Sequence, residues 1–294
     1  MRCRILLPAL MVLIFSGLAG LAAAQTPPAP AYTENGFTPV LLDASAPQSA
    51  RMQAFSRVIA LANQGQVRAQ DLAGTLYWWG PKVSGSAVPV NLGQARKLLA
   101  NAAIHGDVLA MAKMAELELV AGRSMPAMVW AQMYARYLNP ARGPRSAKFN
   151  GYAAQLINRI VKAGGKADQA VRVGVASLVT RYDKDIRQGI DILQHQEDHG
   201  RTFMVQRPQP TQRDSSELTK LGGVAEYMVA FDASGKTRQI WPLDAFPHPE
   251  LQSDLRNYLD NIVANAATGD SGMRYLRVSI THQPYKFRLL RLRH

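Results

Sequence analysis

The stretch ARKLLANAAIHG (Ala95–Gly106) decides the fold of the N-terminal half, because AFSRVIALANQG (Ala54–Gly65) repeats its pattern earlier in the chain. Both stretches place small and aliphatic residues at three- and four-residue spacing, which predicts helices that a neighbouring helix can approach closely. Each stretch closes on a glycine, which ends a helix cheaply because it accepts a left-handed conformation. We expect a partner helix after each stretch, closed in the same way by Gly80 and by Gly122.

A third, weaker echo of this pattern begins at Ala127 and continues through Trp130 and Tyr134. Helix pairs of this size cannot bury their apolar faces alone, so consecutive pairs stack on one another. Residues 47–200 are rich in alanine at helical spacing and contain few β-branched runs. The sequence therefore predicts a helical region with two to three stacked pairs.

Residues 55–138 resemble Sel-one-like repeats, a branch of the tetratricopeptide-type α/α repeats. Ala102-Ala103-x-x-Gly106 and Tyr77-x-x-Gly80 match the family pattern, whereas Leu98 replaces its usual aromatic residue and Ala73 its usual glycine. The resemblance implies a scaffold for protein contacts and supplies no catalytic residue.

From Gly222 onward the apolar residues recur with a period of two, which predicts strands around a polar turn at residues 232–236. Leu251, Leu255, Tyr258, Leu259, Ile262 and Val263 form one stripe of an expected amphipathic helix. We expect strands at 224–231, 237–241 and 274–281, with a last extended stretch at 285–292. The fold class expected is multidomain: an α/α helical-repeat region followed by a small α+β domain of order β-β-α-β.

Residues 222–294 resemble the C-terminal domain of the TonB family of periplasmic energy-transducing proteins. An apolar strand leading to Asp232-x-x-Gly235, a second strand, a helix and a terminal strand pair carry the resemblance. Residues 262–268 lack the aromatic-basic-proline element that is usual in the family helix. The resemblance implies a related fold used for binding partners.

The N-terminus has the pattern of a signal peptide. Arg2 and Arg4 precede an uncharged apolar run at residues 5–24, and Ala22 and Ala24 form the small-x-small pattern of a cleavage site. An uncleaved anchor in the inner membrane is the alternative, because the run is just long enough to span a bilayer. The expected division is a signal peptide at 1–24, a linker at 25–46, the helical region at 47–200, an exposed linker at 201–219 and the α+β domain at 220–294.

Composition narrows the function classes. The 294 residues include one cysteine, Cys3, which rules out a disulfide scaffold. The net charge of the chain is +13. Residues 121–182 hold ten Lys or Arg against the single acid Asp168, and residues 271–294 hold six against none. Export makes nucleic acid an unsuitable partner, so the basic surface is either solvated or faces an anionic envelope surface.

Three short motifs could bind a metal, bind a phosphate or act as an acid and base, but each is explained more simply by a structural role. His195 and His199 lie four residues apart, a spacing that can ligate zinc, but no third ligand is evident, and a solvated helix end explains both. Ser234–Thr237 resembles the end of a phosphate-binding loop and fits a hairpin turn better. Asp183 and Asp185 have basic neighbours and are expected to pair with them. We therefore predict no catalytic residue and no cofactor.

These observations predict an exported, non-catalytic protein of the bacterial periplasm that binds other envelope proteins through its helical repeats or a sheet edge. The first alternative is a divergent TonB-type energy transducer held in the inner membrane, and the second is a metal-dependent hydrolase. Adjacent tryptophans cannot both face one side of a helix, so one of the pair is available for contact. The residues predicted to contact a partner are Trp78, Trp79, Trp130, Tyr134, Arg136, Arg274 and Arg277.

Overall fold

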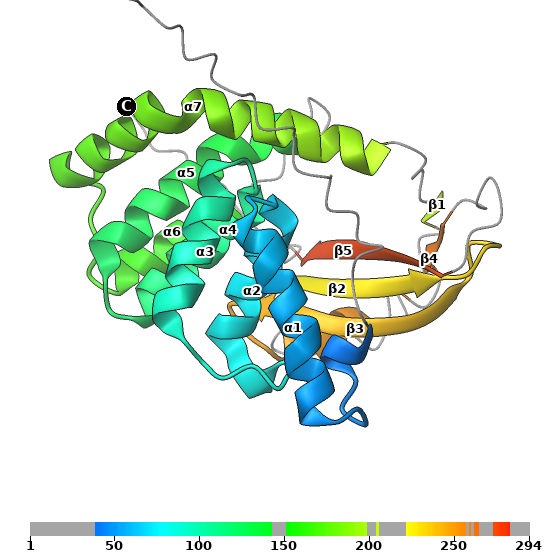
Figure 1. The fold of residues 1–294 in the computed structure, drawn as a ribbon. Coiled ribbons are helices and arrows are strands. Elements are labelled where there is room, and N and C mark those ends of the chain that lie inside the picture. Colours follow the sequence, from blue (N-terminus) through cyan, green and yellow to red (C-terminus); the bar gives the residue numbers. More distant parts are fainter. Residues whose placement is uncertain are drawn as a thin grey trace, which may run out of the picture.

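A computed structural model describes residues 39–142, 151–198, 204–205, 222–256, 259, 262–264 and 273–282. The helical elements are η2 Pro39–Leu42, α1 Gln48–Asn63, α2 Val67–Trp79, η3 Gly80–Lys82, α3 Leu92–Ile104, α4 Val108–Val120, α5 Ser124–Arg142, α6 Gly151–Lys162, α7 Gln169–Asp198 and α8 Leu251–Arg256. The strands are β1 Met204–Val205, β2 Gly223–Phe231, β3 Thr237–Phe246, β4 Ile262–Val263 and β5 Arg274–His282. Figure 1 shows helices α1 to α6 on one side of the molecule and the three long strands on the other.

Helices α1 to α6 pack in chain order, each against the next. The predicted helix ends are confirmed: Gly80 directly follows α2, and Gly65, Gly106 and Gly122 lie two residues beyond the last residue of α1, α3 and α4. All four have positive φ. Asparagine or aspartate caps the start of two helices, because Asn91 accepts a hydrogen bond from Gln94 N–H and Asp107 accepts one from Ala110 N–H. Local sequence signals therefore set these helix boundaries.

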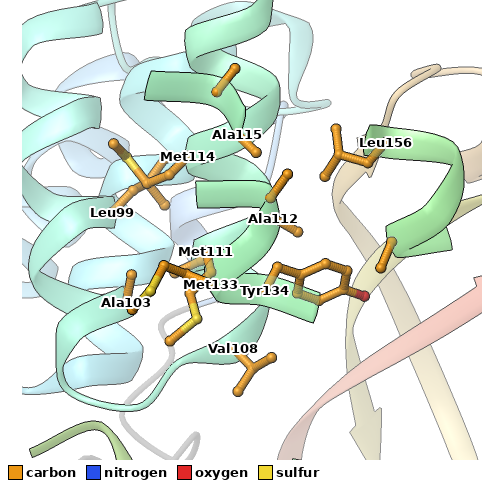
Figure 2. Packing of buried hydrophobic residues seen from close by; sticks show 14 of the residues in the cluster. Leu99, Ala103, Val108, Met111, Ala112, Met114, Ala115, Met133, Tyr134 and Leu156 are labelled. Atoms are coloured by element: carbon orange, nitrogen blue, oxygen red, sulfur yellow. The ribbon is translucent and has the colours of Figure 1, made fainter. Parts of the chain in front are cut away.

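Small and flexible apolar side chains fill the space between these helices. Figure 2 shows Met111 and Met114 of α4 beside Leu99 and Ala103 of α3, with Met133 of α5 also in contact range of this cluster. The buried alanines permit close helix approach, and methionine fills irregular gaps between them. The expected helical region is thus a continuously packed stack.

The 30-residue helix α7 packs along α5 and also contacts α3. Its backbone comes very close to the α3–α4 turn: a Cβ atom at Gly106 would overlap the backbone of Gly189 and Ile190. Glycine is required on both sides of this crossing, since a Cβ at Gly189 would overlap His105.

Strands β3, β2 and β5 form an antiparallel sheet with β2 in the centre. The polar residues 232–236 form the predicted hairpin turn, in which Gly235 has a φ of 85° and Lys236 N–H donates to Asp232. One face of the sheet carries Met228 and Trp241 and shares a hydrophobic core with α1 and α2. The opposite face is covered by α8. A helical region and a small antiparallel sheet therefore form one packed body.

The helix expected from Leu251 to Val263 is wrong in its length. Helix α8 ends at Arg256, and Ile262–Val263 instead form strand β4, which pairs with Met204–Val205 of the expected linker. The β-branched pair favours extended backbone, and a neighbouring strand satisfies its hydrogen bonds.

The signal peptide, the 285–292 stretch and His199 lie outside the described residues. Among the residues that the structure does describe, no helix has the length and apolar character needed to cross a bilayer.

Candidate functional site: a buried charge cluster and its cavity

Lys113 lies at the junction between the helices and the sheet, with 1% of its side chain exposed. Its Nζ donates to both carboxylate oxygens of Asp71, at 3.0 and 2.9 Å, and to Thr75 Oγ1 at 2.9 Å. The same ammonium group pairs with Glu226 of β2 and lies 3.4 Å from Asp244 Oδ2 of β3. One cation of α4 thus connects α2 with two strands.

The other members of the cluster extend these contacts across the sheet. Arg277 of β5, with 4% of its side chain exposed, pairs with Asp71 of α2. Ser279 Oγ donates to Glu226 Oε1 at 3.2 Å, and Trp79 Nε1 donates to Asp244 Oδ1 at 2.5 Å. All three long strands are therefore joined to α2 or α4 by polar contacts.

The cluster shifts the pKa values of its members. Burial acts to lower the pKa of Lys113, but the carboxylates of Asp71, Glu226 and Asp244 outweigh it and raise that pKa. Burial raises the pKa of Asp244 to about 7, with Glu226 and Asp71 adding to the effect of burial. The pKa of Asp71 falls below its ordinary value because, against the effect of burial, Lys113 and Arg277 stabilise its charged form.

Asp107 forms the rim of the cluster, beside a cavity of about 250 Å³. Its Oδ2 lies 3.5 Å from Arg68 Nη1 and accepts no hydrogen bond from the described residues. Burial raises the pKa of Asp107 to about 6, and Asp71 adds to this shift. The cavity is lined by Arg68, Gly106, Asp107, Val108, Leu109, Leu138, Ile190, Leu193, Gln194, Ser279 and Thr281. Parts of α2, α4, α5, α7 and β5 meet there.

The residues predicted to contact a partner do not share one surface. Trp78 and Tyr134 are buried in the helical core, and Arg277 is buried in the charge cluster. Trp79 stacks on Trp78 with ring centroids 4.6 Å apart and reaches the sheet through Asp244. Trp130 and Arg274 are half-buried, and Arg136 is exposed and lies over the Tyr137 ring. Trp79 thus contacts this chain's own sheet, and Trp78 packs in the helical core.

The short motifs that the sequence singled out lie away from the Lys113 charge cluster. His195 is exposed on α7, and its Nδ1 lies 2.7 Å from the Asp191 carbonyl oxygen. Within the described part of the chain, no group of three or more potential metal ligands gathers. Asp183 pairs with Arg187 at 2.8 Å, as expected, and accepts a hydrogen bond from Tyr137.

Sequence reasoning missed the cluster, although α4 carries a usable signal. The helix VLAMAKMAELELV is apolar on every side except for Lys113, Glu116 and Glu118. A helix that is hydrophobic all round is buried, so its charges must find partners. All three do: Glu116 binds Arg159 at 2.9 Å and Glu118 binds Arg96 at 2.8 Å.

Comparisons with protein-family models, with curated proteins and with solved structures found no match for this chain.

Proposed function

We propose that this chain is a non-catalytic binding protein of the bacterial periplasm, and that it holds an extended segment of another envelope protein against strand β5. The observation that carries the proposal is the edge position of β5. This nine-residue strand pairs with β2 on one side, and no other described strand pairs with it. The edge of a sheet can accept an incoming strand through main-chain hydrogen bonds.

The sides of β5 suit such a partner. Leu276, Val278 and Ile280 lie on the face covered by α8, and the last two are half-buried at its margin. Arg277 and Ser279 lie on the other face, within or beside the charge cluster. A partner strand with alternating apolar and polar residues would extend both faces.

The helical surfaces are a weaker candidate for docking. The sheet packs against α2 and its neighbours, while α7 lies along α5 and contacts α3. We propose further that α1 to α6 are degenerate Sel-one-like repeats and that the sheet with α8 is a TonB-type C-terminal module. The buried Ala102, Ala103 and Ala95 at the α3 interface support the first assignment.

Site-specific photocrosslinking in intact cells tests the binding surface. A photoreactive residue at Ser279 of β5 is expected to crosslink to an extended segment of an envelope protein, identified by mass spectrometry of the crosslinked peptide. The same residue at Val173, which is 57% exposed on α7, is the matched control. Equal crosslinking from both positions, or none from Ser279, would contradict the proposal.

The mature N-terminus tests the location. Cleavage after Ala24 is expected, and mass spectrometry of the cell-derived protein should find a chain that begins at Gln25. An intact residue 1 together with inner-membrane fractionation would instead support the anchored transducer.

A further inference from the structure

The cavity beside Asp107 combines an apolar wall with two opposite charges. Val108, Leu138 and Leu193 are each at most 8% exposed and supply part of the wall. Arg68 and Asp107 supply the charges, and Ser279 and Thr281 supply hydroxyl groups from β5. A concave site that has an apolar wall and a few converging polar groups suits a small ligand.

The two charges are adjacent, but the contact between them is long. The 3.5 Å from Arg68 Nη1 to Asp107 Oδ2 exceeds the roughly 2.7–2.9 Å of a charge-assisted hydrogen bond. Asp107 is 3% exposed, and its Oδ2 accepts no hydrogen bond from the described residues. A buried carboxylate oxygen without a donor is costly, so a ligand that brings an N–H donor would gain from meeting it.

Arg68 can take part in the same ligand. A guanidinium group carries five N–H donors in a planar fork, so it can hold a second oxyanion while it stays beside Asp107. A ligand with both charges also enters the site without adding net charge, which avoids the cost of burying an uncompensated ion.

We propose that this cavity binds a small zwitterionic amino acid with an apolar side chain. The ammonium group pairs with Asp107, the carboxylate pairs with Arg68, and the side chain lies against the wall of Val108, Leu138 and Leu193. The volume of about 250 Å³ is below the roughly 300–1,000 Å³ of sites for drug-sized ligands, which fits an occupant of this size. This proposal does not depend on the binding role of the β5 edge.

The ionisation of Asp107 agrees with this pairing. Its pKa of about 6 results from burial and from Asp71 and Glu226, which are opposed by Arg68 and Lys113. The carboxylate is therefore charged at about pH 7.5, where a free amino acid carries both of its charges.

Three ligands of matched shape test the proposal on the full-length chain by calorimetry at about pH 7.5. Leucine carries both charges, 4-methylpentanoate lacks the ammonium group, and 3-methylbutylamine lacks the carboxylate. We expect leucine to bind at least about tenfold more tightly than either analogue, because its ammonium group and its carboxylate each add a charge-assisted contact. No saturable binding of leucine at millimolar concentration, or equal binding of leucine and one analogue, would overturn the proposal.

Substitutions locate the binding event. Asp107→Asn keeps a side-chain oxygen for the N-cap of α4 and removes the negative charge. Leucine should therefore bind to this variant no more tightly than 4-methylpentanoate binds to it. Leu193→Trp should fill the cavity and abolish binding of leucine. Asp191→Asn is the matched control, because its side chain is 70% exposed on the same helix as Leu193. Leucine binding that survives Leu193→Trp in a folded variant would place the ligand elsewhere and overturn the proposal.

Discussion

At the scale of single residues, Lys113 is the side chain on which the junction depends most. Replacing it by methionine keeps its length and removes the cation that Asp71, Glu226 and Asp244 share. We expect Lys113→Met to lower the free energy of unfolding by about 3–5 kcal/mol, because buried carboxylates lose their partner. Urea unfolding measures the change.

Lys97→Met serves as the control for that substitution. Lys97 is exposed on α3, so its replacement should change the free energy of unfolding by no more than about 0.5 kcal/mol. Equal effects of the two substitutions would show that the Lys113 contacts contribute no net stability.

Asp244 gives the stability a pH dependence. Its pKa is raised from 3.8 to about 7, so the folded protein holds a proton that the unfolded chain releases between these two values. The stability from this group is present at low pH and is lost as the pH rises through about 7. The free energy of unfolding should therefore increase when the pH is lowered from about 8 to about 6.

Asp244→Asn tests the source of this dependence, because an amide keeps an oxygen that can accept from Trp79 Nε1 and does not titrate. Urea midpoints at about pH 8 and about pH 6 should differ in the parent chain, and the difference should shrink in the variant to the part that comes from Asp107, whose pKa is raised to about 6. Asp71, whose pKa is lowered, acts in the opposite direction and only near or below its ordinary value of 3.8. An unchanged difference in the variant would assign the dependence to another group.

The sequence predicts the glycines and alanines of the core much better than it predicts the charge pairs. Gly106 as the end of α3 and Ala102 as a close-packing residue act through local helix geometry, so these roles follow from spacing alone. The approach of α7 to Gly106 does not. The partners of Lys113 come from α2, β2 and β3, and their meeting depends on how the sheet lies on the helices. Such long-range pairing has no periodic signal in the chain.

At the scale of elements, the crossing of α7 over the α3–α4 turn makes a testable contrast between two glycines. Gly65 and Gly106 have similar φ values, 85° and 98°. A Cβ at Gly65 would meet nothing within 4 Å, whereas one at Gly106 would overlap α7. Gly65→Ala should cost about 1 kcal/mol for its left-handed backbone, and Gly106→Ala clearly more.

Thermal and urea unfolding of both alanine variants measure this difference. The backbone cost is common to both, so the excess in Gly106→Ala reports the packing of α7 against the turn. Identical losses would mean that α7 moves aside without cost.

Element boundaries show where sequence reasoning succeeds and where it fails. Residues 251–263 contain a helical stripe, but only the segment from Leu251 to Arg256 is helical. The pairing of Ile262–Val263 with Met204–Val205 competes with the helix, and the stripe does not reveal that competitor. Boundaries set by glycine at positive φ, such as the end of α3, have no such competitor.

At the scale of the whole molecule, the helices and the sheet should unfold as one cooperative unit. Core residues of β2, Val224 and Met228, pack with the helices, and the charge cluster crosses the same boundary. We expect the amides of β2 and α4 to exchange with solvent through the same global opening, with equal free energies in native-state hydrogen exchange.

Lys113→Met should lower the exchange free energy of both elements together. Loss of protection in β2 while α4 stays protected would instead show two units that open separately. The sequence predicts the helical region and the strands, but the change of period near Gly222 does not indicate that the two pack together. That contact depends on complementary surfaces, which are formed only when both parts have folded.

The order of the cluster's members along the chain has a consequence for biosynthesis. Asp71 and Lys113 are synthesised first, whereas Arg277 follows Lys113 by 164 residues (277 − 113). Until the strands have been synthesised, water hydrates the Asp71–Lys113 pair, and the side of the helices that the sheet covers stays exposed. A chain that lacks β5 therefore leaves the Asp71–Lys113 pair hydrated, and a protease should cleave this open state more readily than the folded protein.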